Sequence, residues 1–143
     1  MIRSLAFALV LVPVAAAADF PETSAPDLVL LKTWIEEGQP QAAVDVLKVE
    51  LAEAPSADIL NLLGYAHRKL QNWEAARGYY ERALALNPRH TGALEYFGEL
   101  ELETGNPEAA RRLHARLADA CPDGCEELDD LNEAFATHGV AHP

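Results

Sequence analysis

The fold of the chain is decided by residues 69–88, which read KLQNWEAARGYYERALALNP. This stretch runs from a polar turn through a pair of alanines and a pair of tyrosines to a closing proline. Strong helix formers fill the positions from Trp73 to Leu86, and the proline that follows cannot continue a helix. We therefore predict one helix that begins after the turn and ends just before Pro88.

The same pattern occurs twice more in the chain. Residues 36–55 read EEGQPQAAVDVLKVELAEAP, and residues 103–122 read ETGNPEAARRLHARLADACP. The alanine pairs of the three stretches fall at positions 42–43, 75–76 and 109–110, and the closing prolines fall at positions 55, 88 and 122. Such a nearly constant period indicates a helical repeat protein. Each unit should therefore be a pair of antiparallel helices joined by a tight turn.

The turns of the three units carry their own signals. The residues that end the first helices are Gly38, Gln71 and Gly105. Glycine at such a position suits the left-handed conformation that commonly ends a helix. Asn72 and Asn106 follow two of these residues, and asparagine at such a position predicts a side-chain cap on the second helix.

This pattern resembles the tetratricopeptide repeat, whose signature joins a large apolar residue, Leu-Gly, an aromatic residue, Ala, a second aromatic residue, Ala-Leu and Pro. The middle unit matches it best, with Leu60, Leu63-Gly64, Trp73, Ala76, Tyr80, Ala83-Leu84, Leu86 and Pro88. The third unit has Leu94, Phe97-Gly98, Gly105, Ala110, Leu117 and Pro122. The first keeps Leu30-Leu31, Trp34, Gly38, Ala43, Leu47 and Pro55, with Leu31 in place of the glycine. The bulk of Leu31 suits an end unit with no neighbour packed on that side.

The resemblance implies an all-α fold of three helix-turn-helix units in a right-handed superhelix. We place the units at about residues 24–56, 57–90 and 91–124. Residues 125–137 then form an amphipathic capping helix, because their apolar side chains fall on one stripe. These side chains are Leu128, Leu131 and Phe135. The helix should cover the exposed end of the third unit, and residues 138–143 should form a flexible tail.

The N-terminal residues predict export. Residues 1–18 have a positive start at Arg3, an apolar run and a small-residue cleavage pattern that ends at Ala18, which together indicate a signal peptide. Residues 19–23 would then lead into the first unit. We expect a periplasmic or secreted protein with no membrane insertion after signal removal, and the chain is similar to small exported tetratricopeptide proteins of alphaproteobacteria. The net charge of -12 argues against nucleic acid and anionic membranes as partners.

The two cysteines, Cys121 and Cys125, enclose the residues Pro-Asp-Gly, which suit a type I turn that brings their neighbours together. In an oxidising compartment this spacing favours a disulfide that fixes the capping helix to the last unit. A redox role and a metal role stay open as alternatives. The spacing is not Cys-x-x-Cys, and two thiolates alone do not make a zinc site.

No catalytic, metal or cofactor motif is visible in the sequence. The five histidines show no ligand spacing, and there is neither a nucleophile motif nor a glycine-rich phosphate loop. We expect His67 and His114 to pack between helices and His90 to lie in a turn. The sequence thus predicts a protein that is not an enzyme and that needs no cofactor.

In the tetratricopeptide family, the first helix of each unit lines an inner groove that meets ligands. The resemblance therefore implies a partner-binding stripe of Lys32, Asn61, Tyr65, Arg68, Lys69, Glu95, Glu99 and Glu103. Tyr65, which is central and aromatic, is the best single anchor. Arg68 and Lys69 could neutralise the glutamates, or the glutamates could attract a basic peptide.

These observations predict an exported, non-catalytic scaffold that binds a protein or peptide through its concave face, during assembly of an envelope complex. A self-oligomerising structural module and a cysteine-dependent redox helper are the alternatives. The identity of the partner and the oligomeric state do not follow from the sequence.

Overall fold

The computed structural model describes residues 27–141, which form seven α-helices and no strand. The predicted signal peptide, residues 1–18, and the lead-in, residues 19–23, lie outside the described part. The first helices of the successive pairs are α1 (Leu28–Glu36), α3 (Ala57–Lys69), α5 (Thr91–Glu103) and α7 (Glu126–Thr137). The second helices are α2 (Pro40–Glu53), α4 (Trp73–Leu86) and α6 (Pro107–Ala120).

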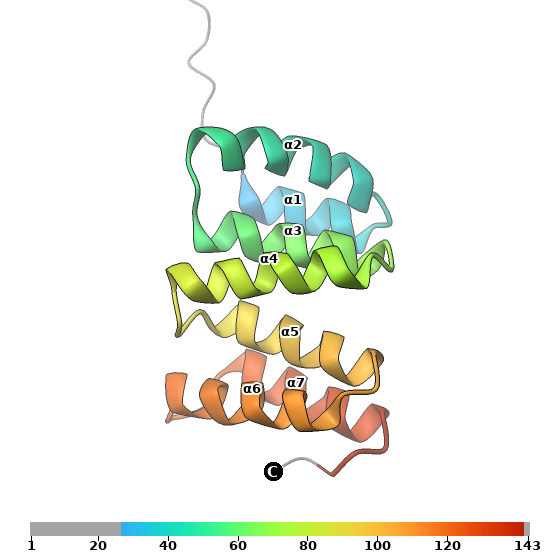
Figure 1. Ribbon diagram of the computed structural model, residues 1–143, viewed down its shortest axis with the longest axis vertical. Helices are drawn as coiled ribbons and strands as arrows, with labels where there is room; N and C mark the ends of the chain where they lie inside the picture. Colours follow the sequence, from blue (N-terminus) through green and yellow to red (C-terminus); the bar gives the residue numbers. More distant parts are fainter. Residues whose placement is uncertain (1–26, 142–143) are drawn as a thin grey trace, which may run out of the picture.

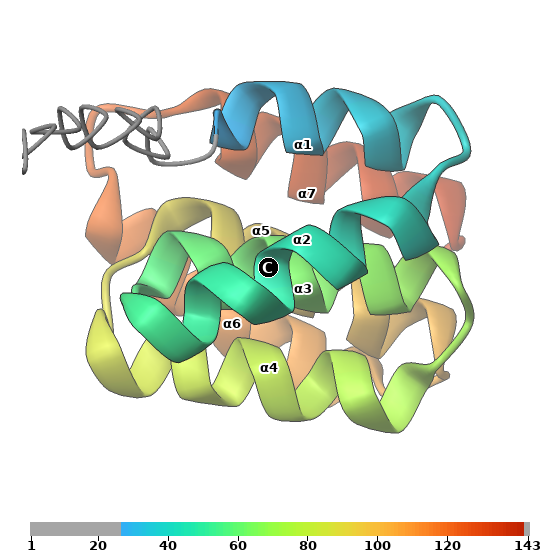
Figure 2. The same ribbon diagram turned by 90° about the horizontal axis from the view of Figure 1, so that it is seen from above.

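The helices stack in chain order, from α1 and α2 at one end to α6 and α7 at the other (Figure 1). Seen from above, α1 and α7 lie along one side of the stack and α4 lies along the opposite side (Figure 2). We call the surface of α1, α3, α5 and α7 the inner face, and that of α2, α4 and α6 the outer face. The predicted all-α helical repeat fold is confirmed.

Close approach of the helices depends on Gly64 and Gly98, which hold equivalent positions in the second and third units. A Cβ atom at Gly64 would stand 2.5 Å from a ring carbon of Tyr80, which packs against α3 from α4. A Cβ atom at Gly98 would stand 2.8 Å from Leu131 of α7. The capping helix therefore packs against the glycine of the third unit.

In the first unit, the position equivalent to Gly64 and Gly98 is occupied by a larger residue, Leu31. Leu31 is only 3% exposed and belongs to the apolar cluster that joins α1, α2 and α3. The expectation that its bulk faces an unpacked side was wrong, because the side chain fills the interior of the first unit.

The turns follow the predicted backbone but not the predicted caps. Gly38, Gln71 and Gly105 all have positive φ angles, of 85°, 59° and 78°. Asn72 and Asn106 do precede their helices, but neither side chain makes a capping hydrogen bond. Nδ2 of Asn106 instead donates to Oγ1 of Thr104 at 3.2 Å. The predicted side-chain caps are therefore wrong.

The capping helix is anchored at both of its ends. Leu131 and Phe135 are fully buried against the third unit, and the backbone N–H of Gly124 donates to the carbonyl of Cys121 at 3.0 Å, closing the turn before α7. Cys121 and Cys125 form a disulfide in the structure, with their Cα atoms 5.9 Å apart. In the predicted tail, Nε of Arg111 donates to the carbonyl of Ala141 at 3.3 Å, and residues 142–143 lie outside the described part.

Candidate functional site: an acidic inner face

Two adjacent cavities run along the inner face. The first, which we call the Glu95 cavity, has a volume of about 370 Å³. It is lined by Lys32, Asp58, Asn61, Leu62, His90, Thr91, Gly92, Glu95, Tyr96, Glu126, Glu127 and Asp130. The second, the Arg68 cavity, has a volume of about 310 Å³. It is lined by Arg68, Glu99, Glu103, Asp130, Glu133, Ala134, Thr137 and His138. All eight residues of the predicted stripe lie on α1, α3 and α5, and six of them line these two cavities, the exceptions being Tyr65 and Lys69.

Arg68 of α3 neutralises part of the acidic stripe on α5. Its side chain is 7% exposed and forms an ion pair with Glu99. Its Nε atom lies 3.8 Å from Oε1 of Glu103, and its Nη1 atom donates to the carbonyl of Tyr96 at 3.2 Å. Two of the three stripe glutamates are therefore compensated from the neighbouring unit, as one of the two sequence interpretations proposed.

Tyr65, which the sequence predicted as the best single anchor, is largely covered in the structure. It is 6% exposed, and its ring stacks on that of Tyr96 with the centroids 4.6 Å apart. The guanidinium of Arg68 lies 5.5 Å from the ring centroid, and the ammonium of exposed Lys69 lies 5.2 Å from it. Because these neighbours cover it, Tyr65 supports the wall of the inner face instead of projecting from it. Partner binding by the stripe as a whole stays a prediction.

Glu95 differs from the other two glutamates of the stripe. It is 5% exposed, and among the described residues it has neither an ion pair nor a hydrogen bond. Burial raises the pKa of Glu95 to about 8, and the nearby carboxylates of Glu99, Asp130 and Glu127 add to this rise. Lys32 opposes it only weakly, because its ammonium is exposed and lies 3.7 Å from a carboxylate oxygen of Glu36. The cavity thus holds a buried carboxyl group without a counter-ion.

His90, which was expected only to lie in a turn, lines the Glu95 cavity and links two of its helices. It is the N-cap of α5, where its Nδ1 atom accepts the N–H of Ala93 at 3.1 Å. Its Nε2 atom lies 2.9 Å from Oδ1 of Asp58, which ties α5 to the start of α3. A histidine cap has no strong sequence signature, so only the position of Asp58 in space reveals this link.

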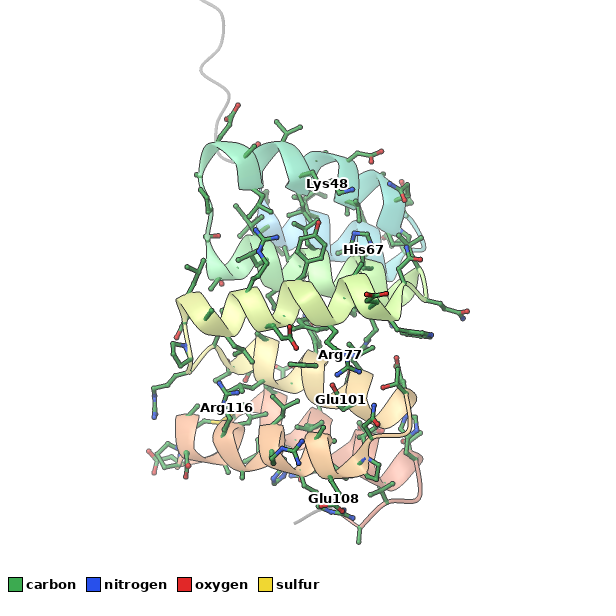
Figure 3. The ribbon with its side chains drawn as sticks, viewed as in Figure 1. Lys48, His67, Arg77, Glu101, Glu108 and Arg116 are labelled. Carbon is green, nitrogen blue, oxygen red and sulfur yellow. A yellow bond between two sulfur atoms is a disulfide. The ribbon has the colours of Figure 1, made fainter. Side chains whose placement is uncertain are left out.

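The outer face holds its charges differently. Figure 3 shows Arg77 of α4 and Glu101 of α5 facing each other, and these two residues form an ion pair. The same view shows Lys48 near His67, whose ring stacks on Tyr79 at 5.2 Å. Burial, with the Lys48 ammonium nearby, lowers the pKa of His67. His67 and His114 pack between helices as predicted, since His114 meets the ring of Phe135 edge-on.

Neither metal binding nor membrane spanning finds support in the described residues. Within residues 27–141, no three histidine, cysteine or carboxylate side chains are grouped so that they could hold a metal ion. In the same range, none of the helices combines the length and apolarity needed to cross a bilayer.

Comparisons with known proteins agree with this architecture. Residues 61–124 match the family model of the tetratricopeptide repeat. The fold is similar to the crystal structure of MamA, with a TM-score of 0.64 and 24% sequence identity over 79% of this chain and 67% of that one. No curated protein sequence matches the chain significantly. The resemblance seen in the sequence is confirmed for residues 61–124, the part of the chain that matches the tetratricopeptide repeat.

Proposed function

We propose that the protein is an exported, non-catalytic scaffold that binds a protein or peptide along its inner face. Tetratricopeptide repeats suggest a protein-interaction scaffold as the general role. The outer side also has two adjacent cavities, of about 370 and 500 Å³, but the buried glutamate that lines both of them, Glu101, is paired with Arg77. The observation that carries the choice of the inner face is the buried carboxyl group of Glu95, which has no partner among the described residues and lines a cavity that gathers polar groups from four helices. Groups left without partners favour a face that meets another molecule.

Export and a role in assembling an envelope complex are part of this proposal. Their support is the signal-peptide pattern of residues 1–18, together with a cysteine pair that forms a disulfide in the structure. An oxidised pair suits a periplasmic or secreted protein. Fractionation of the native cells, with the mass of the purified protein, tests this point, and a chain that keeps residues 1–18 in the cytoplasm contradicts it. Alkylation without reductant tests the alternative redox role, which requires free thiols in a fraction of the molecules.

The inner face is tested with charge reversals of matched size. Asp130 and Glu133 are exposed on α7 at the rims of the two cavities, so the double change Asp130→Lys and Glu133→Lys alters this face without disturbing the core. Glu53→Lys with Asp119→Lys makes the same change of charge at exposed positions of α2 and α6. We expect the first pair to lose a partner that mass spectrometry identifies with the wild type, and the second pair to keep it. Equal capture by both pairs would reject the inner face as the binding surface.

A second candidate function is self-association. Helices α4 and α6 carry five arginines, Arg77, Arg82, Arg111, Arg112 and Arg116, on the side of the molecule away from the acidic inner face. Opposite charges on opposite faces could join copies head to tail. Sedimentation over a range of protein and salt concentrations tests this. A salt-sensitive oligomer that the Asp130 and Glu133 reversals abolish supports it, and a monomer at all concentrations excludes it.

A further inference from the structure

The Glu95 cavity contains two hydrogen-bond acceptors that no described residue satisfies. The first is the carboxyl group of Glu95, a residue of α5 whose exposed fraction is only 5%. The second is Oδ1 of Asn61 on α3, which is buried and has no hydrogen-bond partner among residues 27–141. Asn61 is itself only 7% exposed. Oδ1 of Asn61 is enclosed by the protein, whereas the Glu95 carboxyl group is not among the enclosed unpaired atoms, so Glu95 is the group that a donor from outside the chain could reach.

Close packing brings the Asn61 amide to the cavity wall. Its Nδ2 atom would lie 3.1 Å from a Cβ atom built on Gly92, so a larger residue at position 92 would crowd this side chain. The absence of a side chain at Gly92 therefore leaves the space that Asn61 occupies between α3 and α5. The Asn61 side chain is thus held between two helices, which makes this part of the cavity wall rigid.

The charges that face Glu95 come from every helix around the cavity. Lys32 of α1 is the one lysine or arginine among the lining residues, and it lies 3.7 Å from Glu36. On α3, Asp58 is held by His90, and on α5, Glu99 is paired with Arg68. On α7, Glu127 accepts a hydrogen bond from Oγ1 of Thr91 at 2.7 Å, and exposed Asp130 has no ion pair among the described residues. The field in the cavity therefore favours a positive guest and disfavours an acidic one.

We propose that the Glu95 cavity receives the ammonium or guanidinium group of a lysine or arginine side chain from a bound peptide. Glu95 would be the counter-ion of this group, and Asn61 would form part of the cavity wall. The aliphatic part of such a side chain would lie against Leu62 and Tyr96, which also line the cavity. This inference rests on the proposed function, because it names the chemistry of the segment that the inner face would bind.

Binding of a cation should also release a proton. The raised pKa of Glu95, about 8, leaves this carboxyl group largely protonated near pH 7 in the free protein. A cation placed beside it favours the ionised form, so the proton leaves as the peptide binds. If the role of Glu95 were purely structural, peptide binding would not release this proton.

The experiment uses isothermal titration calorimetry with three end-blocked peptides, in which serine alternates with lysine, with glutamine or with glutamate. We expect the lysine peptide to bind, and the other two to bind at least about tenfold more weakly, because glutamine brings no positive charge to the acidic cavity and glutamate is repelled by it. Repeating the titration at pH 7 in buffers of different ionisation enthalpy should show net proton release. Spermidine serves as a free polyamine, and equal binding of spermidine and the lysine peptide would overturn the assignment to a peptide side chain.

Variants decide whether Glu95 is the counter-ion. Glu95→Gln keeps the shape of the side chain and should weaken the lysine peptide about 30-fold and reduce its proton release. The control Glu53→Gln makes the same substitution at an exposed position on α2 and should leave both unchanged. Asn61→Asp, a second variant of the same size, should strengthen binding by adding a carboxylate. Unchanged affinity in Glu95→Gln, with circular dichroism showing a folded protein, would overturn the inference.

The outcomes separate this inference from the proposed function. Equal binding of the lysine and glutamine peptides, weakened for both by the Asp130 and Glu133 reversals, would reject the cation site but keep the inner face. Failure of every peptide to bind would also reject the cation site. The partner-capture comparison would then decide the scaffold function independently.

Discussion

Helix α5 buries two glutamates, one in the inner cavity and one toward α4 and α6, and they differ in what they meet. Glu101, 1% exposed, forms an ion pair with Arg77 of α4 on the outer face. Glu95, 5% exposed, faces the inner cavity without a partner among the described residues. Both carboxyl groups lose hydration on folding, and only one gains a compensating partner within the chain. The difference indicates that the outer pair serves folding and that the inner group is left available for binding.

The largest effect is expected on the outer side of this comparison. Arg77→Ala would leave the carboxylate of Glu101 buried without a partner, which costs about 3–5 kcal/mol in the free energy of unfolding. Urea unfolding at pH 7 measures the loss. Lys32→Ala is the control on the inner face, because its exposed pair with Glu36 contributes only a few tenths of a kcal/mol. Equal losses in the two variants would show that the Arg77–Glu101 pair has no special structural role.

A smaller effect of opposite sign is expected for Glu95→Gln. Because the pKa of Glu95 is raised from 4.5 to about 8 on folding, the folded state binds this proton more tightly than the unfolded chain does. Glu95 therefore costs nothing below about pH 4.5, becomes increasingly destabilising as the pH rises, and reaches its full cost above about pH 8. The variant should be equal to the wild type at pH 4 and more stable than it at pH 9, by at most the roughly 5 kcal/mol to which the whole pKa shift corresponds.

Urea unfolding at these two pH values checks the difference, and Glu101→Gln provides the contrast. That variant loses its ion pair with Arg77 and should be less stable than the wild type at pH 9. If Glu95→Gln were instead less stable than the wild type at pH 9, the Glu95 carboxylate would have to have a stabilising partner in the folded protein, contrary to the structure.

The smallest effect on stability is expected for Asp130→Asn, which should change the free energy of unfolding by less than about 0.5 kcal/mol, since the residue is exposed. The same change should lower the pKa of Glu95, because it removes one of the like charges that raise this pKa. Carbon-13 NMR of the glutamate carboxyl groups measures that pKa. An unaltered Glu95 titration in Asp130→Asn would mean that Asp130 does not contribute to the field of the cavity.

The repeat period made the helices and their order predictable, because similar residues recur at a nearly constant interval and must repeat the same packing. The repeat register also indicates that Glu101 lies at an unusual position for a charged residue. This residue holds the position in α5 that His67 holds in α3 and Phe135 holds in α7, and both of those rings are packed against other rings. A charged residue in such a register indicates a buried ion pair.

The side-chain environment of the inner face could not be predicted in the same way. The stripe residues were identified by their register, but their burial depends on partners from the next unit, such as Tyr96 stacking on Tyr65. Whether Arg68 pairs with Glu95, Glu99 or Glu103 depends on the shift between two helices, which the sequence spacing does not define. The unpaired state of Glu95 is therefore visible only in three dimensions.

The most direct test of the account is the titration of the Glu95 carboxyl carbon by NMR, assigned with the Glu95→Gln variant, with and without the alternating serine-lysine peptide. The account predicts a midpoint of about pH 8 in the free protein and a lower midpoint when the peptide is bound. A midpoint in the free protein at the ordinary glutamate value of 4.5, or one that saturating peptide leaves unchanged, would contradict it.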